Sequence, residues 1–296
     1  MSPQVPASDK QGSDNKQSQQ ENNVTLLCAP EYAKHNGILR KYNEFVLDFC
    51  KLAFTTTPDS SQQFLDVGCG PGDFTRDVLL SHCLPCRRIV GVDFSREMIE
   101  YARRNSAHEK IDFAVLDIAA DVSQFLDQYG HFERVYSFYC LNWVDDLSAA
   151  VKNISRLMTP TGECVLGILC GVRGCRFLEG TRRNGSLGKT LTKYVPKTQD
   201  LRDRKELLTF LSRILQEAGL FPTIQEVLIS TCLYNWSEED VLATYMNTLP
   251  IIKLISDEEK LQLSADVKDL IRNVQLPGLQ NWRYKMFIVK ASKSPF

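Results

Sequence analysis

The segment 64–72, FLDVGCGPG, constrains the fold more than any other, because an apolar strand-like run ends in three alternating glycines. Gly68, Gly70 and Gly72 carry no Cβ, so the backbone can turn tightly and come close to a ligand. Asp66 precedes the turn, and its charge would repel a pyrophosphate but suits a cationic group. The spacing G-x-G-x-G also differs from the G-x-G-x-x-G of dinucleotide-binding folds. The segment therefore predicts a cofactor-binding turn, with a purely structural turn as the alternative.

Strand-like and helix-like segments alternate from this turn onwards. The predicted strands are 64–67, 88–93, 111–116, 132–138, 163–170, 223–233 and 284–290. The predicted helices between the first five strands are 73–80, 96–105, 122–129 and one that runs through 151–158. Such alternation is typical of a parallel sheet with helices on both faces. We expect a doubly wound α/β fold with a mostly parallel seven-stranded sheet and a helical cover.

The chain divides into a polar tail and one globular domain. Residues 1–23 hold almost nothing that could be buried and should be disordered. The expected parts of the domain, 24–296, are an N-terminal helical cover at 24–55, a cofactor-binding core at 64–170, a basic lid-like loop at 171–200 and a helical insertion at 236–275. The basic loop carries seven arginines and lysines against two acidic residues, so a solvated surface is the alternative to a lid.

Charge and cysteine content limit the partners and the compartment. A net charge of −1 creates no global field that favours nucleic acid or an anionic membrane. Ten cysteines in 296 residues are too few for a disulfide scaffold, and the first ten residues lack the apolar core of a signal peptide. No apolar run approaches the about 18 residues of a membrane span. We therefore expect a soluble, cytoplasmic protein with free thiols, for which a nucleic-acid partner is disfavoured.

One cysteine pair has the spacing of metal ligands. Cys83 and Cys86 form a C-x-x-C, but no second pair lies at the distance that a zinc ribbon requires. The pair also flanks a loop proline, Pro85. We interpret these cysteines as incidental thiols and expect no metal site.

Carboxylates at two further strand ends extend the predicted cofactor site. Asp93 ends the second strand, about 20 residues after the glycine turn, where doubly wound folds place an acid that accepts hydrogen bonds from both hydroxyls of a ribose. Asp117 and Ile118 follow the third strand and could contact the amino group and the ring of an adenine, although a loop N-cap explains Asp117 equally well. Phe94 and Met98 could supply another apolar wall, with core packing as the alternative.

In this order, the features resemble class I S-adenosylmethionine-dependent methyltransferases. The matching residues are the turn 66–72, Asp93, Asp117 with Ile118, and the fourth-strand run 132–137. The resemblance covers roughly 64–170, and the last pair of strands is consistent with it. It implies a Rossmann-like methyltransferase fold, S-adenosylmethionine as the cofactor and Ser137 as a further cofactor contact. Such an enzyme works mainly by placing the sulfonium methyl in line with an acceptor.

The run 137–144, SFYCLNWV, resembles the juvenile hormone acid methyltransferases of arthropods, as do residues 32–39 and 286–289. In that family the tryptophan helps to hold the substrate carboxylate, a role that the resemblance carries to Trp143. An indole N–H donates one hydrogen bond while the ring offers an apolar wall, and core packing is the alternative role. The candidates for orienting the acceptor are Trp143, Asn142, Tyr139 and Tyr32.

The resemblance implies methyl transfer to the carboxylate of a small apolar acid, similar to juvenile hormone acid or farnesoic acid, giving a methyl ester. Two positions depart from the family pattern, because Leu39 stands in place of a glutamine and Asn142 in place of a histidine. Leucine cannot donate a hydrogen bond, and asparagine cannot take a proton. An ionised carboxylate needs no general base, so the loss of the histidine is compatible with carboxyl methylation.

Other functions stay open on the sequence alone. A methyltransferase for another acceptor class, such as a protein, a nucleic acid or a different small molecule, could use the basic loop as its docking surface. A binding protein could retain the cofactor fold without catalysis, with Leu39 and Asn142 as signs of the loss. The glycine spacing disfavours an NAD-dependent dehydrogenase. The sequence carries no indication of the oligomeric state.

Overall fold

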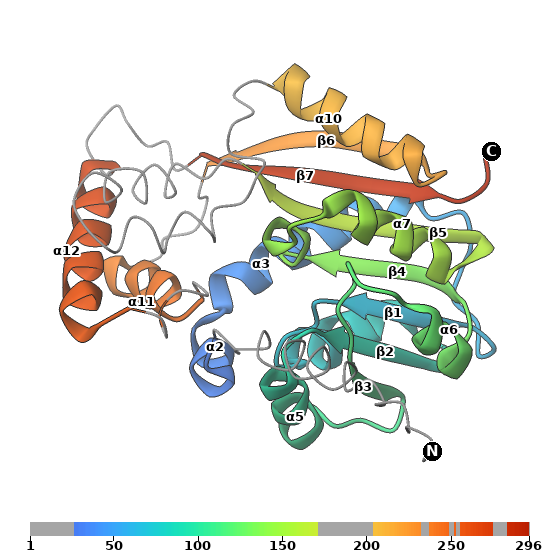
Figure 1. Cartoon of the computed structure of the whole chain (residues 1–296), viewed down its shortest axis with the longest axis horizontal. Helices are drawn as coiled ribbons and strands as arrows, with labels where there is room; N and C mark the ends of the chain where they lie inside the picture. The colour runs from blue at the N-terminus through green and yellow to red at the C-terminus, as the bar shows by residue number, and fades with distance from the viewer. Residues whose placement is uncertain are drawn as a thin grey trace, which may run out of the picture.

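The computed structural model describes residues 27–170, 204–231, 237–248, 252, 255–274 and 283–295. The predicted tail at 1–23 and the predicted basic loop at 171–200 lie outside the described residues. Within those ranges, no helix is both long enough and apolar enough to cross a membrane. The described chain is built around one sheet with helices on both faces (Figure 1).

Seven strands form this sheet in the order β3-β2-β1-β4-β5-β7-β6. Their bounds are β1 Gln63–Val67, β2 Arg88–Asp93, β3 Ile111–Val115, β4 Phe132–Phe138, β5 Met158–Cys170, β6 Phe221–Thr231 and β7 Arg283–Ser292. The first five strands pair in parallel, and β7 pairs antiparallel with both β5 and β6. The predicted doubly wound α/β fold with a mostly parallel seven-stranded sheet is confirmed.

The strand order reverses at β1, which pairs with β2 on one side and with β4 on the other. Val67, the last residue of β1, pairs with Val92 of β2 and with Ser137 of β4. The glycine turn therefore begins where the carboxyl ends of three strands meet. Ligands of open α/β sheets bind outside such a reversal of strand order. This topology makes the glycine turn the first place to look for a functional site.

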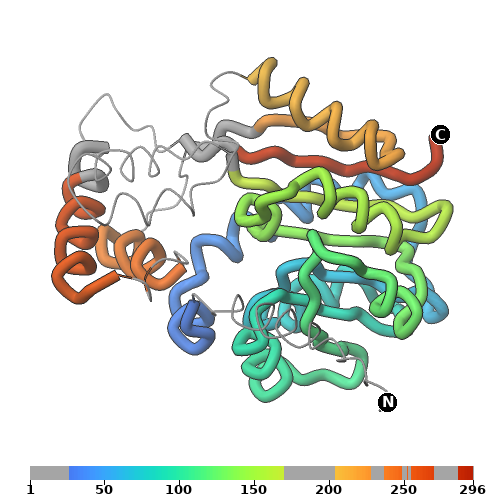
Figure 2. The backbone as a smooth tube through the Cα atoms, viewed as in Figure 1, coloured from blue at the N-terminus to red at the C-terminus, as the bar shows by residue number. Residues whose placement is uncertain are grey.

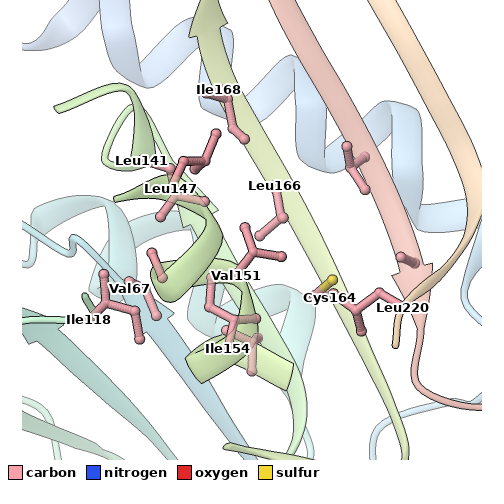
Figure 3. Close-up of a cluster of buried hydrophobic side chains, with 14 of the residues drawn as sticks. Val67, Ile118, Leu141, Leu147, Val151, Ile154, Cys164, Leu166, Ile168 and Leu220 are labelled. Atoms are coloured by element: carbon pink, nitrogen blue, oxygen red, sulfur yellow. The ribbon is translucent and has the colours of Figure 1, made fainter. Parts of the chain in front are cut away.

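The helices lie in two layers, because successive side chains of a strand enter opposite faces of the sheet. The helices are α2 Ala29–His35, α3 Gly37–Cys50, η1 Lys51–Ala53, η2 Thr75–Leu79, α4 Leu80–Cys83, α5 Arg96–Asn105, α6 Ser123–Tyr129, η3 Leu141–Trp143, α7 Leu147–Leu157, α10 Arg204–Glu217, α11 Glu238–Thr248 and α12 Asp257–Val274. Val67 lies in a buried cluster with side chains of α7 and β5 (Figure 3). Leu65 and apolar residues of α6 and α10 belong to the same cluster. Phe64 packs on the other face with α3, α4 and α5.

The N-terminal helices and the helices between β6 and β7 lie on the side to which β1 and β4 point (Figures 1 and 2). The expected N-terminal helix is in fact two helices, α2 and α3, which meet at the buried Asn36. The predicted helices after β6 are present as α11 and α12. Thr244 of α11 donates its hydroxyl to the His35 carbonyl of α2 at 3.1 Å. The N-terminal helices and the helices between β6 and β7 are therefore in direct contact, at the edge of the sheet where the glycine turn lies.

One predicted boundary is wrong. The apolar spacing through 151–158 predicts that Met158 is helical, but α7 ends at Leu157 and Met158 begins β5. The Met158 backbone is extended, with ψ 148°. Pro160 follows two residues later, and proline disfavours helix both at its own position and at the residue before it. The predicted fifth strand, which starts at 163, accordingly begins five residues later than β5 does at Met158, whereas the other strand ends agree with the predicted ones to within two residues.

A buried ionic cluster joins β4, β5 and β7 to the segment after η1. Lys290 Nζ lies 2.6 Å from Glu163 Oε1, and Arg134 Nε lies 3.3 Å from Glu163 Oε2. All three side chains are at most 3% exposed. Thr55 donates both its N–H and its hydroxyl to Glu163 at 3.1 Å, and the Arg134 guanidinium lies 3.8 Å from the centre of the Phe54 ring. The cluster thus holds the segment between the N-terminal helices and β1 against the sheet.

Removing the negative charge from this cluster should destabilise the fold. Glu163→Gln leaves two buried cations without a counter-charge, which costs about 3 kcal/mol of unfolding free energy. Urea denaturation measures this loss. Glu217→Gln is the matched control, because the Lys152–Glu217 pair is half-exposed on both sides and should leave the unfolding midpoint unchanged. Equal stability of Glu163→Gln and the wild-type protein would contradict a stabilising role for the cluster.

Candidate functional site

The glycine turn after β1 is held by the neighbouring strand. Gly68 N and Cys69 N both donate to the Val92 carbonyl, at 2.7 and 3.0 Å. Gly68, Gly70 and Gly72 have φ values of 80°, 56° and 76°, a region that residues with a side chain rarely adopt. A Cβ at Gly68 would lie 2.5 Å from Cys140 Sγ. The turn therefore requires glycine both for its conformation and for the close approach of the chain after β4.

Asp93 lies at the end of β2 and accepts two backbone hydrogen bonds. Gly70 N donates to its Oδ2 at 3.1 Å and Ser95 N to its Oδ1 at 2.9 Å. Desolvation raises the pKa of Asp93 to about 6, although both hydrogen bonds favour the ionised form. Ser95 caps α5 by accepting from Met98 N. The carboxylate is thereby fixed against the glycine turn.

Asp66 is the second acid of the site and is only 3% exposed. Burial raises the pKa of Asp66 to about 7, and the negative charges of Asp93 and Asp73 act in the same direction. Thr75 donates its hydroxyl to Asp66 Oδ2 at 2.6 Å, which partly offsets this effect. Two carboxylates thus lie near each other beside the turn. A cation placed there would favour the ionised form of both.

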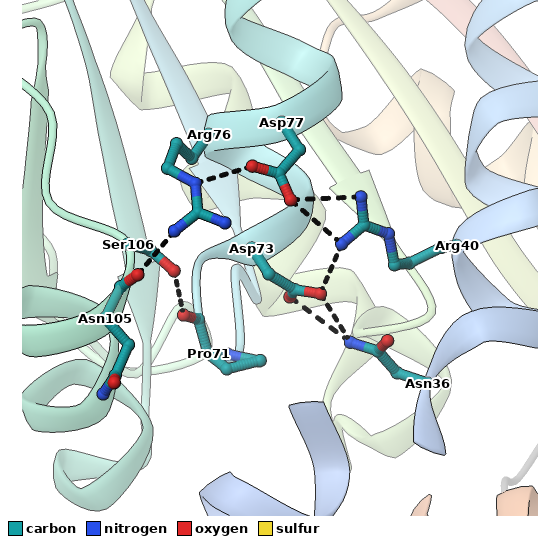
Figure 4. A network of polar contacts seen from close by, with 8 residues as sticks. All are labelled: Asn36, Arg40, Pro71, Asp73, Arg76, Asp77, Asn105 and Ser106. Carbon is teal, nitrogen blue, oxygen red and sulfur yellow. Dashed lines mark hydrogen bonds and ion pairs between the residues drawn. The ribbon is translucent and has the colours of Figure 1, made fainter. Parts of the chain in front are cut away.

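A polar network joins the N-terminal helices to the helix after the turn (Figure 4). Asn36 Nδ2 donates to Asp73 Oδ2 at 3.0 Å, and Arg40 Nη1 donates to the same oxygen at 2.7 Å. Arg40 also donates to Asp77 at 3.3 Å. The network thereby holds α2 and α3 against the segment that follows the glycine turn. Sequence reasoning missed these residues, although Asn36, Arg40 and Asn43 recur at helical spacing as a polar stripe.

A pocket lies between the turn and the N-terminal helices. Its lining is Tyr32, Asn36, Leu39, Arg40, Asn43, Asp66, Gly68, Cys69, Gly70, Pro71, Asp73, Phe74 and Phe138. The empty volume is about 400 Å³ when the open mouth is counted. Asn43 Oδ1 is buried and has no hydrogen-bond partner among the described residues. The lining of the pocket therefore combines carboxylates and amides with aromatic rings.

The predicted acceptor residues lie in the chain that follows β4. Tyr139 is the one residue other than glycine with positive φ, 54°, in the described chain, and its N–H donates to the Gly167 carbonyl at 3.0 Å. The Asn142 side chain is 4% exposed. With its amide oriented to satisfy both neighbours, Nδ2 donates to the Tyr139 carbonyl at 3.1 Å and Oδ1 accepts from Trp143 Nε1 at 2.9 Å. The Trp143 ring is 39% exposed.

The structure brings Tyr32, Asp66, Gly68 and Gly70 together in one pocket, and Asp93 adjoins it through Gly70. The other predicted cofactor residues are placed differently. Phe94 is 50% exposed, whereas Met98 and Ile118 are buried at 2% and 4% exposure. Asp117 is exposed and accepts from Ala119 N at 2.9 Å. Ser137 is fully buried, and its hydroxyl donates to the Val67 carbonyl at 3.0 Å.

The C-x-x-C cysteines lie in the core rather than in the candidate site. Cys83 and Cys86 are free thiols with no exposed surface. Burial raises the pKa of both thiols. Across the described ranges, no three histidine, cysteine or acidic side chains are grouped so that they could hold a metal ion.

Known proteins resemble this chain in sequence and in fold. The sequence family described as "Methyltransferase domain" matches residues 65–166. Juvenile hormone acid O-methyltransferase of Bombyx mori is 30% identical over 219 residues, which cover 72% of this chain and 74% of that protein. The Drosophila melanogaster enzyme of the same name is 35% identical over 142 residues, or 47% of each chain. The crystal structure of the cyclase SpnF covers 87% of this chain and 82% of its own, with a TM-score of 0.55 and 16% identity.

The chain belongs to the class I S-adenosylmethionine-dependent methyltransferases. Within this class it resembles the juvenile hormone acid O-methyltransferases of insects. S-adenosylmethionine is accordingly its methyl donor. The likeness to a cyclase concerns the fold alone, since one fold can support unrelated reactions.

The residues of the pocket fit this cofactor. The direction of a Cβ at Gly70 is open, with Tyr32 Cε1 as the nearest atom at 3.8 Å, so a ligand can approach the backbone. Asp66, Asp93 and the unpartnered Asn43 Oδ1 are acceptors. The donor groups of the cofactor, an ammonium and two ribose hydroxyls, need such acceptors. The chemistry of the lining thus agrees with the methyl donor of the class.

Alanine substitutions in the glycine turn should differ in how much they lower the free energy of unfolding. Gly70→Ala meets open space and should lose about 1 to 2 kcal/mol of unfolding free energy from the positive φ alone. Gly68→Ala has the same strain and also collides with Cys140, so we expect a loss of about 2 to 5 kcal/mol. Thermal unfolding compares the two variants. Equal losses would show that the contact with Cys140 relaxes without cost.

The buried Asp66 should make stability depend on pH. Its carboxyl stays protonated up to a pH of about 7 in the folded protein, whereas the unfolded chain ionises near about 4. Between these values the folded state holds a proton that the unfolded state has released, so stability falls as the pH rises. Asp66→Asn should remove the part of the pH-dependent loss of stability that comes from Asp66. Urea denaturation at about pH 5 and about pH 7.5 tests it, and an unchanged pH dependence in the variant would contradict the assignment.

Proposed function

We propose that the chain methylates the carboxylate of a small apolar acid, similar to juvenile hormone acid or farnesoic acid, and so forms a methyl ester. The observation that carries this proposal is the chemistry of the chain after β4. Asn142 and Trp143 have no basic atom, and desolvation raises the pKa of Cys140, so its thiol keeps its proton. A carboxylate is already ionised at neutral pH and needs no base, unlike a hydroxyl or an ammonium acceptor.

The similarity to two insect enzymes named juvenile hormone acid O-methyltransferase supports the same acceptor class. The departures at Leu39 and Asn142 are compatible with it. Leu39 lines the pocket as an apolar wall, which suits a hydrocarbon chain. Two other pocket residues on α3, Arg40 and Asn43, are polar. The same helix therefore presents polar side chains that suit the carboxylate of the acid and an apolar side chain that suits its hydrocarbon chain.

When bound, S-adenosylmethionine supplies an electrophilic methyl group. A carboxylate oxygen of the acid would form the new bond to the methyl carbon as the carbon–sulfur bond breaks, and the bonding electrons stay with sulfur. No proton moves in this step. The contribution of the protein is to hold the two partners in line and to exclude water.

Each predicted residue has a role in this proposal. Asp66 with Gly68, Gly70 and Gly72 would hold the methionine portion, Asp93 the ribose and Asp117 the adenine. Phe94 would add an apolar wall, and the buried Ile118, Met98 and Ser137 would support these contacts from within the protein. Trp143, with Tyr32, Tyr139 and Asn142, would orient the acid. The N-terminal helices and the pair α11 and α12 would cover the acid's apolar chain.

An acceptor panel tests the reaction. Full-length protein is incubated with S-adenosylmethionine labelled in its methyl group and with terpenoid acids, straight-chain acids, and the alcohol and amine of matching carbon skeleton. We expect label in base-labile methyl esters of the acids and none in the alcohols or amines. Label confined to alcohols, amines, protein or nucleic acid would refute the carboxylate acceptor. Cofactor binding by calorimetry without any turnover would indicate a binding protein instead.

A further inference from the structure

The chain after β4 takes an unusual path at Tyr139. Its φ of 54° lies in the left-handed region, which a residue with a side chain rarely adopts. Such a conformation persists only when its surroundings hold it in place. One constraint is the hydrogen bond from Tyr139 N to the Gly167 carbonyl of β5 at 3.0 Å. The second is the hydrogen bond that the Tyr139 carbonyl accepts from Asn142 Nδ2 at 3.1 Å.

The other end of the same amide holds the indole of Trp143. Asn142 Oδ1 accepts from Trp143 Nε1 at 2.9 Å, and Trp143 N donates to the Cys140 carbonyl at 2.9 Å. Asn142 is buried, whereas the Trp143 ring is 39% exposed. Packing restricts the rotamer of a half-exposed ring less than that of a buried one, so the hydrogen bond to a buried partner helps to fix the direction of the ring.

We propose that Asn142 is a positioning residue, which locks the Trp143 ring and the Tyr139 turn into one rigid unit beside the methyl-transfer site. Because the indole N–H is already donated to Asn142, Trp143 presents its ring to the acid rather than a hydrogen-bond donor. The consequence for catalysis rests on the proposed carboxyl methylation. The hydrogen bonds themselves do not depend on the identity of the acceptor.

This role differs from the one that the resemblance implies for Trp143. A tryptophan that binds the carboxylate directly needs a free N–H, whereas a ring held by Asn142 acts as an apolar wall for the hydrocarbon chain. In the first case, removal of the Asn142 side chain would free the donor and preserve or improve binding of the acid. In the second case, it would release the ring and weaken binding. The two roles therefore predict opposite results for one substitution.

A double-mutant cycle separates these roles. Asn142→Ala and Trp143→Phe each remove one partner of the 2.9 Å hydrogen bond. We expect each to lower kcat/KM for the acid about tenfold, mainly through KM, with the affinity for S-adenosylhomocysteine unchanged. The double variant should be no worse than the poorer single variant, because both remove the same contact. Losses that multiply, or an Asn142→Ala enzyme with unchanged or lower KM, would overturn the proposal.

A rescue and a matched control complete the activity measurements. Asn142→His retains a ring nitrogen that can accept from the indole, so we expect it to recover most of the loss. Asn105→Ala removes an exposed amide that donates to the Tyr101 carbonyl of α5 at 2.9 Å, and it should leave the kinetics unchanged. Failure of the histidine variant to recover activity, while its thermal unfolding equals that of the wild type, would count against a hydrogen-bonding role for Asn142.

A spectroscopic measurement tests the hydrogen bond without any acceptor. The chain has three tryptophans, and ¹⁵N labelling of their indoles produces one resonance each. Trp143→Phe identifies the Trp143 signal. We expect Asn142→Ala to shift this signal upfield and to accelerate its exchange with water at least tenfold, since the donor is then exposed. An unmoved signal would refute the contact. If the signal moves but no acid is methylated, the proposed acceptor is wrong and the positioning role stands.

Discussion

The missing side chain at Gly68 is the constraint on which the candidate site depends. Because this residue has no Cβ, Cys140 can occupy the adjoining space, and Gly68 N donates to the Val92 carbonyl at 2.7 Å. The ends of β1, β2 and β4 thus converge on one backbone turn. Asp93 reaches Gly70 N at 3.1 Å as a result. Cofactor residues from β1 and β2 and the acceptor chain after β4 are brought to one place by this convergence.

Electrostatics complements this geometry. Asp66 and Asp93 are both largely removed from water, with pKa values raised to about 7 and about 6. Arg40 does not neutralise them, because its guanidinium is held by Asp73 and Asp77. No cationic side chain of the described residues lowers these two pKa values, so a cationic ligand would favour the ionised form of both carboxyls. A sulfonium cofactor with an ammonium group is such a ligand, so the local electrostatics and the family membership agree.

Local patterns allowed much of this arrangement to be predicted. The strands of the sheet follow from apolar runs bounded by turn residues, and the glycine turn with Asp66 and Asp93 follows from spacing, because each of these signals lies within a short segment. The boundary at Met158 was wrong, since apolar spacing is the same at the end of a helix and the start of a strand. The network of Asn36 and Arg40 with Asp73 was missed because its partners are more than thirty residues apart in the chain.

The sequence by itself determined the fold class, the methyl donor and the order of the site residues along the chain, because backbone conformation and strand burial depend mainly on residue type and spacing. Only the tertiary structure decided which groups are free to act. Ile118, Met98 and Ser137 are buried, and the indole N–H of Trp143 is directed to Asn142. Hydrogen-bond direction and burial depend on side-chain packing across separate strands, and no local pattern encodes them. The same residues that resemble a family's substrate site can therefore have different tasks here.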